Sequence, residues 1–340
     1  MELLTLADPK ELGGIALRGR LGQGGMGVVY FGVTEDGEPV AVKTIRAENV
    51  SKPAIRSRFD REILAMGMVQ GPRVAALVQA CEPGADAQPW LAVEYVQGLT
   101  LAEYTEGEGT LPAELGAALG MLLAEALTEI HRVGLLHRDF KPGNIILGRD
   151  GPIVIDFGLV GLLDETGDIT HTGDMLGTPH CMAPEQVRAQ GHVTSAADVY
   201  ALGVVLTYAM TGHYLYRRPD RNSLLFAIAD PGTAPDLSGL PDPVLGIVQS
   251  MIAHEPTDRP ALPAVTAALA DVLAGSGLTP VAAQRRFAEL TYVERKSDPS
   301  LPPRAADRAR RIPRDPEPPK EIVQQVANDL RRDYSRDARF

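Results

Sequence analysis

A short stretch of the chain carries an aspartate, a lysine and an asparagine at close spacing, in the run His137-Arg138-Asp139-Phe140-Lys141-Pro142-Gly143-Asn144. Asp156 follows twelve residues after Asn144. Asp139 can accept or orient the proton of an attacking hydroxyl, and Lys141 can neutralise charge on a group in transfer. Asn144 and Asp156 offer the hard oxygen ligands that Mg²⁺ prefers. Each residue alone also suits a turn or a loop cap, but the four in this register indicate phosphoryl transfer from a metal-bound donor.

A glycine-rich segment, Gly22-Gln23-Gly24-Gly25-Met26-Gly27, precedes this cluster. Glycine lets backbone N–H groups approach phosphate oxygens without a Cβ in the way. The same GxGxxG spacing occurs in dinucleotide-binding turns, but those turns open a helix. Here residues 28–33 read VVYFGV, which is typical of a strand. The segment therefore predicts a hairpin that closes over phosphates, with a plain hairpin turn as the alternative.

Lys43 ends the next apolar strand segment, Ala41-Val42-Lys43. A lysine that points inward from an apolar strand is costly unless it meets an anion. Phosphate groups are one such partner, and Glu62, in a segment with helical spacing, is another. Because a lone strand lysine is more often a solvated edge residue, Lys43 counts only together with the other motifs.

Hydrophobic periodicity divides the chain into a small β-rich part and a larger helical part. Strand patterns occur at 15–45, 74–81 and 90–96, and a helical pattern occupies 54–68. Further helices are predicted at 112–133, 194–211, 221–229, 242–253 and 261–274. The predicted fold class is therefore α+β, with a small sheet lobe that carries one helix and a larger helical lobe after it.

An ordered set of motifs resembles that of the bacterial, actinobacterial-type, eukaryotic-like serine/threonine protein kinases. The motifs read LGQGGMGVVY, AVK, HRDFKPGN, DFG, GTPHCMAPE, DVYALG and DRP, and they extend over residues 12–275. The resemblance implies a two-lobed kinase domain, with an N-lobe at 12–97 and a C-lobe at 98–275. It implies ATP and Mg²⁺ as cofactors, with Mn²⁺ as an alternative metal, and protein hydroxyls as acceptors. Lys141 corresponds to the serine/threonine signature of the family, as opposed to the tyrosine one.

The resemblance also implies a nucleotide site between the lobes. Glu94 and Val96 correspond to hinge positions that offer backbone groups to adenine, and Val93 corresponds to the gatekeeper. Lys43 corresponds to a catalytic lysine that pairs with Glu62 in the active state. The implied nucleotide-contacting residues are Leu21, Gly22, Gly24, Gly27, Val29, Ala41, Lys43, Glu94 and Val96.

Further structural roles are implied for the helical lobe. Asp198 corresponds to the helical aspartate that holds the backbone of the catalytic loop. Glu185 and Arg259 correspond to a buried ion pair below the activation segment, and Thr178 to a threonine that contacts the catalytic aspartate. Three residues depart from the usual pattern of the family without removing a catalytic atom, namely Phe140, Gly143 and Cys181.

The segment between residues 158 and 183 corresponds to the activation segment of these kinases. Thr170 and Thr172 lie in it among acidic residues, and phosphorylation there would add negative charge that Arg138 can compensate. We expect autophosphorylation at one of these threonines, between molecules in a transient self-association. By composition alone, threonines in a polar loop are unremarkable.

Composition bounds the function further. The 340 residues are 44% hydrophobic and 23% charged with a formal net charge of −11, which suits a globular protein but not a nucleic-acid binder. The two cysteines, Cys81 and Cys181, show no metal-ligand spacing or disulfide framework, which suits a reducing compartment. Neither a signal peptide nor an apolar run of membrane-spanning length is present. We expect a cytoplasmic protein without a membrane span.

The two ends of the chain carry no catalytic motif. Residues 1–11 are predicted to be an N-terminal leader, and 276–340 a proline-rich, charged tail. Short helices are predicted within the tail at 281–293 and near 320–334. We expect this tail to be dispensable for catalysis. Two other functions stay open. One is a pseudokinase scaffold, which normally lacks a lysine or aspartate that this chain retains. The other is an aminoglycoside-type small-molecule kinase, which needs no activation segment.

Overall fold

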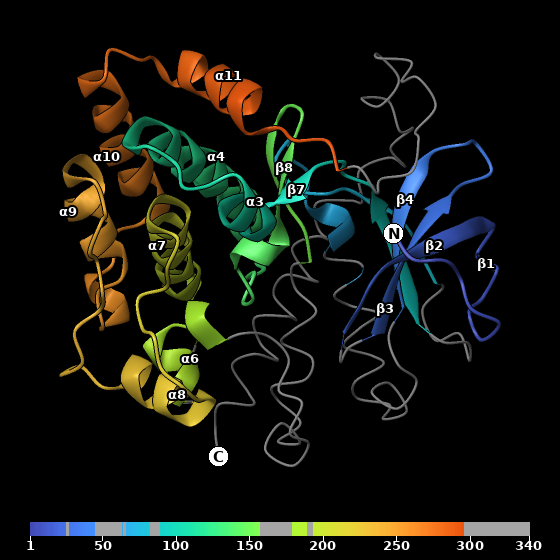
Figure 1. The fold of residues 1–340 in the computed structure, drawn as a ribbon, viewed down its shortest axis with the longest axis horizontal. Helices are drawn as coiled ribbons and strands as arrows, with labels where there is room; N and C mark the ends of the chain where they lie inside the picture. The colour runs from blue at the N-terminus through green and yellow to red at the C-terminus, as the bar shows by residue number, and fades with distance from the viewer. Residues whose placement is uncertain are drawn as a thin grey trace.

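The strand-forming residues of the first part of the chain build one antiparallel sheet (Figure 1). The computed structural model describes residues 1–24, 27–44, 63, 66–81, 89–156, 179–188 and 193–295. The strands are β1 (Glu11–Leu12), β2 (Ile15–Gly24), β3 (Gly27–Val33), β4 (Pro39–Thr44), β5 (Leu77–Ala80) and β6 (Trp90–Glu94), in the order β1-β2-β3-β4-β6-β5. Burial alternates along β4, where Val40, Val42 and Thr44 are buried, so one face of the sheet forms the core of this lobe.

Two long apolar helices form the centre of the second lobe. These are α4 (Ala113–Arg132) and α7 (Ser195–Thr211), which pack against each other. Almost every residue of α7 from Ala197 on is buried, as expected for a helix that is apolar around its whole circumference. The other helices of the described residues are α3 (Leu101–Gly107), α6 (Pro184–Arg188), α8 (Arg221–Ala229), α9 (Asp242–Met251), α10 (Leu262–Gly275) and α11 (Pro280–Thr291). The predicted two-lobed α+β fold is confirmed.

A small second sheet joins the two lobes. Its strands are β7 (Leu99–Thr100), β8 (Ile145–Gly148) and β9 (Gly151–Val154), in the order β7-β8-β9. The Val154 N–H donates to the carbonyl of Arg73 at 2.8 Å, and the Val154 carbonyl accepts from Ala75 at 3.0 Å. The Arg73 guanidinium also donates to the Asp150 carbonyl at 2.6 Å. These bonds hold the end of β9 against the sheet lobe.

Helix α11 extends the packed body beyond the boundary that the sequence predicted at residue 275. It runs along α4, with Phe287 and Thr291 fully buried and Ala283 1% exposed (Figure 1). After it, Glu294 accepts a hydrogen bond of 3.2 Å from Gln97, next to β7. The sequence predicted a short helix at 281–293 but placed it in a flexible tail, because proline-rich segments follow it.

The predicted N-terminal leader also belongs to the sheet lobe. Glu2 and Arg20 exchange both backbone hydrogen bonds at 2.9 Å, and β1 pairs with the start of β2. Of the helix predicted at 54–68, the structure describes only Ile63 and 66–68, which are helical. The predicted helix at 320–334 lies outside the described residues.

No single helix among the described segments combines the length and the apolar character needed to cross a bilayer, although the bent pair α10 and α11 passes that test when the two are taken together.

Candidate active site

The catalytic loop brings three of the predicted polar side chains together. Lys141 Nζ lies 2.6 Å from Asp139 Oδ2, and Asn144 Nδ2 donates to the same oxygen at 3.1 Å. Asn144 also donates to the Asp139 carbonyl at 2.8 Å, because the single turn Pro142–Asn144 folds it back toward the aspartate. The Asp139 side chain is 25% exposed, so it is partly open to solvent.

A buried aspartate on α7 holds the backbone of this loop. Asp198 accepts hydrogen bonds from the backbone N–H groups of His137 at 2.9 Å and Arg138 at 3.0 Å, and His131 Nε2 lies 2.7 Å from its Oδ2. Burial alone would raise the pKa of Asp198, but the bonds from His131 and His137 hold it below the ordinary value. By accepting the Arg138 N–H, the charged carboxylate stabilises the backbone of Arg138 at a φ of 63°. This is a left-handed conformation that non-glycine residues rarely adopt. The predicted structural role of Asp198 therefore has a matching geometry.

An ion pair joins the sheet lobe to the end of β9. Lys43 Nζ on β4 lies 3.0 Å from Asp156 Oδ1, two residues after β9. Lys43 is opposite Val29 of β3, so the ion pair lies beside the glycine-rich hairpin. Asp156 has φ 57°, a second left-handed non-glycine residue at this site. Glu62, the predicted partner of Lys43 in the active state, lies outside the described residues.

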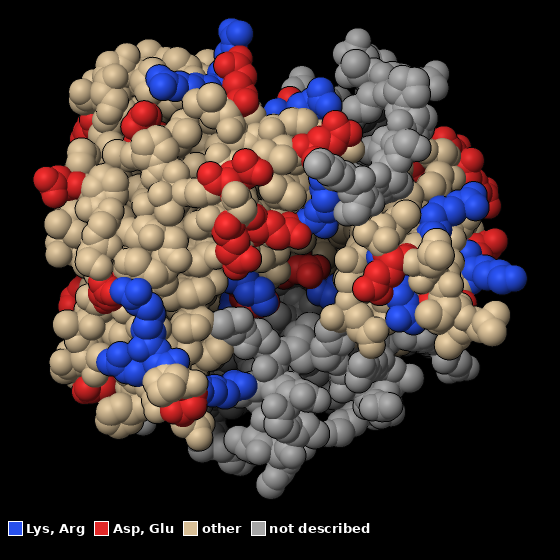
Figure 2. Space-filling view, viewed as in Figure 1, with Lys and Arg blue, Asp and Glu red and all other residues tan. Residues whose placement is uncertain are grey.

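The predicted nucleotide-contacting residues lie on the strands around this ion pair. Leu21, Gly22 and Gly24 are on β2, Gly27 and Val29 on β3, Ala41 and Lys43 on β4, Glu94 ends β6, and Val96 lies just after it. Ala41 pairs with Val93 across β4 and β6, and the Glu94 N–H donates to the Ala76 carbonyl at 2.9 Å. Among the described residues, a Cβ added at Gly22 would meet no atom within 4 Å apart from its chain neighbours. Figure 2 shows a hollow between the lobes where acidic and basic side chains gather.

The donor set of the site suits Mg²⁺ and a nucleoside triphosphate. Asp156 offers a carboxylate, and Asn144 offers its amide oxygen because its amide nitrogen is used by Asp139. The Ile155 N–H donates to the Asn144 carbonyl at 2.9 Å, which holds the two metal-ligand candidates side by side. Lys43 adds a cation for phosphate oxygens beside Asp156.

A second ion pair is buried in the helical lobe. The guanidinium of Arg259 binds Glu185 with two bonds, of 2.7 and 2.8 Å, and its side chain is fully buried. Arg259 also donates to three backbone carbonyls, those of Ala196, Ala253 and His254. The pairing predicted for Glu185 and Arg259 is therefore present. Thr170, Thr172 and Thr178 lie outside the described residues.

Sequence reasoning missed two residues that support the catalytic loop. His131 binds Asp198 from α4, and Gln186 of α6 connects the Ala183 N–H to the Arg138 carbonyl with bonds of 2.9 and 3.3 Å. Their partners are 67 and 48 residues away in the chain, so no local pattern indicates these contacts.

Two of the departures from the usual family pattern are buried. Phe140 is 1% exposed and packs edge-on against His137, with ring centroids 5.1 Å apart. Cys181 is 8% exposed, and burial raises the pKa of its thiol. Cys181 therefore packs in the interior and does not present a nucleophile at the surface.

Comparisons with known proteins agree with this fold. The family model described as the protein kinase domain matches residues 15–270. The serine/threonine-protein kinases AfsK of Streptomyces coelicolor and Streptomyces griseus are 41% and 40% identical over 277 and 278 residues, or 82% of this chain and 34% of each relative. The probable serine/threonine-protein kinase PkwA of Thermomonospora curvata is 38% identical over 76% of this chain and 34% of its own length.

Solved structures support the fold independently. The kinase domain of PknI from Mycobacterium tuberculosis superposes with a TM-score of 0.61 at 24% identity, covering 79% of this chain and all of that domain. The region shared with the curated relatives is about a third of their length. The family model, which matches far more than half of the chain, shows that this chain belongs to the protein kinase family.

Proposed function

We propose that this chain is a serine/threonine protein kinase that transfers the γ-phosphoryl group of ATP to protein hydroxyls. The observation that carries this proposal is the 2.6 Å contact between Asp139 and Lys141, with Asn144 bound to the same carboxylate. This arrangement places a proton acceptor next to a cation in a partly exposed loop. The names of the relatives and the lysine at position 141 support serine and threonine as acceptors.

Each residue has a defined task in this mechanism. Asp139 accepts the proton of the substrate hydroxyl while the hydroxyl oxygen bonds to the γ-phosphorus, the bond from this phosphorus to the bridging oxygen breaks, and ADP leaves. Lys141 neutralises charge on the phosphoryl group in transfer. Asn144 and Asp156 would hold the metal. Lys43 would bind phosphate oxygens. When bound, Mg·ATP supplies the phosphoryl group and neutralises part of its charge.

Regulation would follow from phosphorylation within the segment 158–183. We expect the chain to modify Thr170 or Thr172 in a second copy of itself, with Arg138 as the cation that receives the phosphate. Mass spectrometry after incubation with Mg·ATP tests this step. Full activity of the Thr170→Ala/Thr172→Ala variant, or the absence of phosphate on both threonines, would refute regulation by these threonines. The assignment as a kinase would still stand.

The acceptor distinguishes the remaining candidates. Purified chain is incubated with γ-labelled ATP, Mg²⁺ and myelin basic protein, beside Asp156→Ala. The proposal predicts label on phosphoserine and phosphothreonine with the wild type only. Nucleotide binding without any transfer would favour a pseudokinase scaffold, and label on an aminoglycoside but not on protein would favour the small-molecule kinase.

A further inference from the structure

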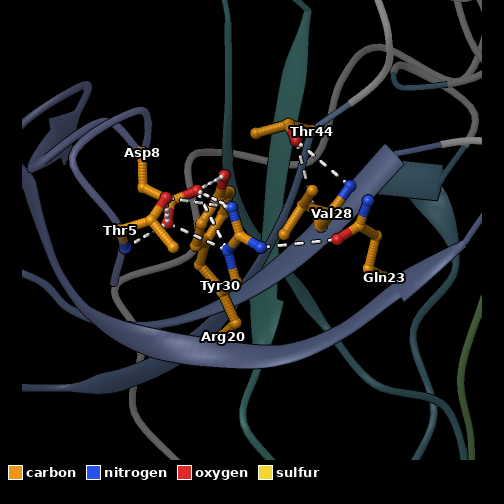
Figure 3. A network of polar contacts seen from close by, with 7 residues as sticks. All are labelled: Thr5, Asp8, Arg20, Gln23, Val28, Tyr30 and Thr44. Carbon is orange, nitrogen blue, oxygen red and sulfur yellow. Dashed lines mark hydrogen bonds and ion pairs between the residues drawn. The ribbon is translucent and has the colours of Figure 1, made fainter. Parts of the chain in front are cut away.

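The first ten residues place a carboxylate against the strands that carry the glycine-rich hairpin. The Asp8 side chain is 2% exposed. It accepts hydrogen bonds from Arg20 Nη2 at 2.7 Å and Nε at 2.9 Å, and from the Tyr30 hydroxyl at 2.8 Å. The backbone N–H and hydroxyl of Thr5 also donate to it, at 2.6 and 2.9 Å. All of these side chains converge on the single carboxylate (Figure 3).

Arg20 and Tyr30 form a cross-strand pair on β2 and β3, next to predicted nucleotide-contacting positions. Tyr30 is adjacent to Val29, and Arg20 is adjacent to Leu21. The guanidinium also reaches into the hairpin, where its Nη1 lies 3.4 Å from the side-chain oxygen of Gln23 (Figure 3). Asp8 is thus connected to the glycine-rich segment through one arginine.

The pairing of β2 with β3 is interrupted on both sides of Arg20. The register shifts between Leu17 and Gly19 and again between Arg20 and Gly22. Such irregularities bend a strand and redirect its side chains. The backbone of Arg20 is held by Glu2 at this point, through two bonds of 2.9 Å. The N-terminal residues therefore fix the strand where its own ladder is irregular.

The electrostatics of the cluster agree with this geometry. The hydrogen bonds from Arg20 hold the pKa of Asp8 well below its ordinary range. Burial raises this pKa, whereas the hydrogen bonds from Thr5 and Tyr30 lower it further. Burial, together with Asp8, raises the pKa of Tyr30 to about 12. At neutral pH the cluster is therefore an ionised carboxylate held between a guanidinium and a phenol.

We propose that Asp8 is a positioning residue for nucleotide binding. It holds Arg20 and Tyr30 so that the glycine-rich hairpin is placed to contact the phosphates. The inference rests on the proposed function, because it requires that the hairpin contacts nucleotide. Asp8 itself touches no reacting atom. Its effect should appear in nucleotide affinity more than in turnover at saturating ATP.

The test compares Asp8→Asn with the wild type. Asn keeps the shape of the side chain but removes the charge, so the dissociation constant for Mg·AMP-PNP should rise about three- to tenfold, with a matching rise in the KM for ATP and little change in kcat. Amide hydrogen exchange should quicken in 19–24. The matched control is Asp236→Asn, which breaks the exposed ion pair with Arg217 in the other lobe and should change neither quantity.

A milder variant keeps the test decisive if Asp8→Asn fails to fold. Tyr30→Phe removes a single hydrogen bond to Asp8 and should raise the same dissociation constant by a smaller factor. A lowered melting temperature with unchanged nucleotide affinity in both variants would reduce Asp8 to a structural role and overturn the inference. Wild-type chain that binds nucleotide but transfers no phosphate would defeat only the proposed function. Wild-type chain that binds no nucleotide would defeat both.

Discussion

Lys43 and Asp156 form an ion pair between the two lobes, with 3.0 Å from Nζ to Oδ1. Lys43 lies on β4, whereas Asp156 follows β9, whose last residue is bonded to the segment around Arg73. The distance between Lys43 and Asp156 therefore depends on the position of the sheet lobe relative to the end of β9. The pair also places a cation next to the candidate metal ligand.

Replacing Lys43 by methionine should remove this cation while keeping the length of the side chain. We predict that Lys43→Met lowers phosphoryl transfer at least about 10²-fold, as expected when a preorganised charge at the reacting phosphate is lost. The circular dichroism spectrum should stay that of the wild type. Lys10→Met, at an exposed position of the same lobe, is the control and should keep full activity. Equal activity of the two variants would refute the role of Lys43.

The buried pair of Glu185 and Arg259 should contribute to stability. Glu185→Ala leaves a fully buried guanidinium without its carboxylate partner, which should cost about 3–5 kcal/mol of unfolding free energy. Asp236→Ala in the exposed pair with Arg217 should cost much less, because solvent screens exposed charges. Urea denaturation measures both values. A loss for Glu185→Ala no larger than the loss for the exposed pair would contradict this account.

Asp198 should make stability depend on acid pH. Its pKa in the folded chain is below the ordinary value of 3.8, so the folded state binds fewer protons than the unfolded state as the pH falls. The stabilisation is fully present above the unfolded pKa and is lost as the pH falls through the folded pKa. Asp198→Asn should be less stable at neutral pH and should lose less stability between about pH 5 and pH 2. The free energy of unfolding of both proteins is measured by urea denaturation at each pH. If it falls equally with pH in both, Asp198 does not cause the acid dependence of stability.

Helix α11 should be needed for stability, whereas the residues after it should not. Phe287→Ala should destabilise the chain by about 3–5 kcal/mol because the ring is fully buried. Leu290→Ala, on the same helix but 54% exposed, is the control and should have little effect. Deletion of 296–340 should leave folding and catalysis intact. Deletion of 277–340 should not, because it removes the buried side chains of α11. This prediction replaces the expectation from the sequence that all of 276–340 is dispensable for catalysis. A stable, active chain after the longer deletion would show that α11 is dispensable.

The sequence predicted the parts of the site that lie close together in the chain. Asp139, Lys141 and Asn144 lie within one loop, so their spacing alone indicated their joint chemistry. Strand patterns and the helical periodicity of the hydrophobic residues likewise predicted strands and helices. These signals are local, and local signals determine which elements form but not how they pack.

Contacts across large sequence separations could not be predicted in the same way. His131 binds Asp198, which is 67 residues away in the chain. Arg20 binds Asp8, which is 12 residues away, at a point where the pairing of β2 with β3 is irregular. Residues 1–11 and α11 have compositions that suit exposed segments, and only tertiary packing shows that they belong to the body. The positions of Glu62 and of the activation-segment threonines stay predictions.

The transfer step itself depends most directly on Asp139. The decisive measurement is the single-turnover rate of γ-phosphoryl transfer to a protein substrate by Asp139→Asn and by the wild type, with the dissociation constant for Mg·AMP-PNP measured on both. Losing a positioned proton acceptor should lower the rate about 10²- to 10⁴-fold while nucleotide affinity changes by less than about twofold. A rate close to that of the wild type, with nucleotide bound equally well, would contradict the assignment of Asp139 and the mechanism built on it.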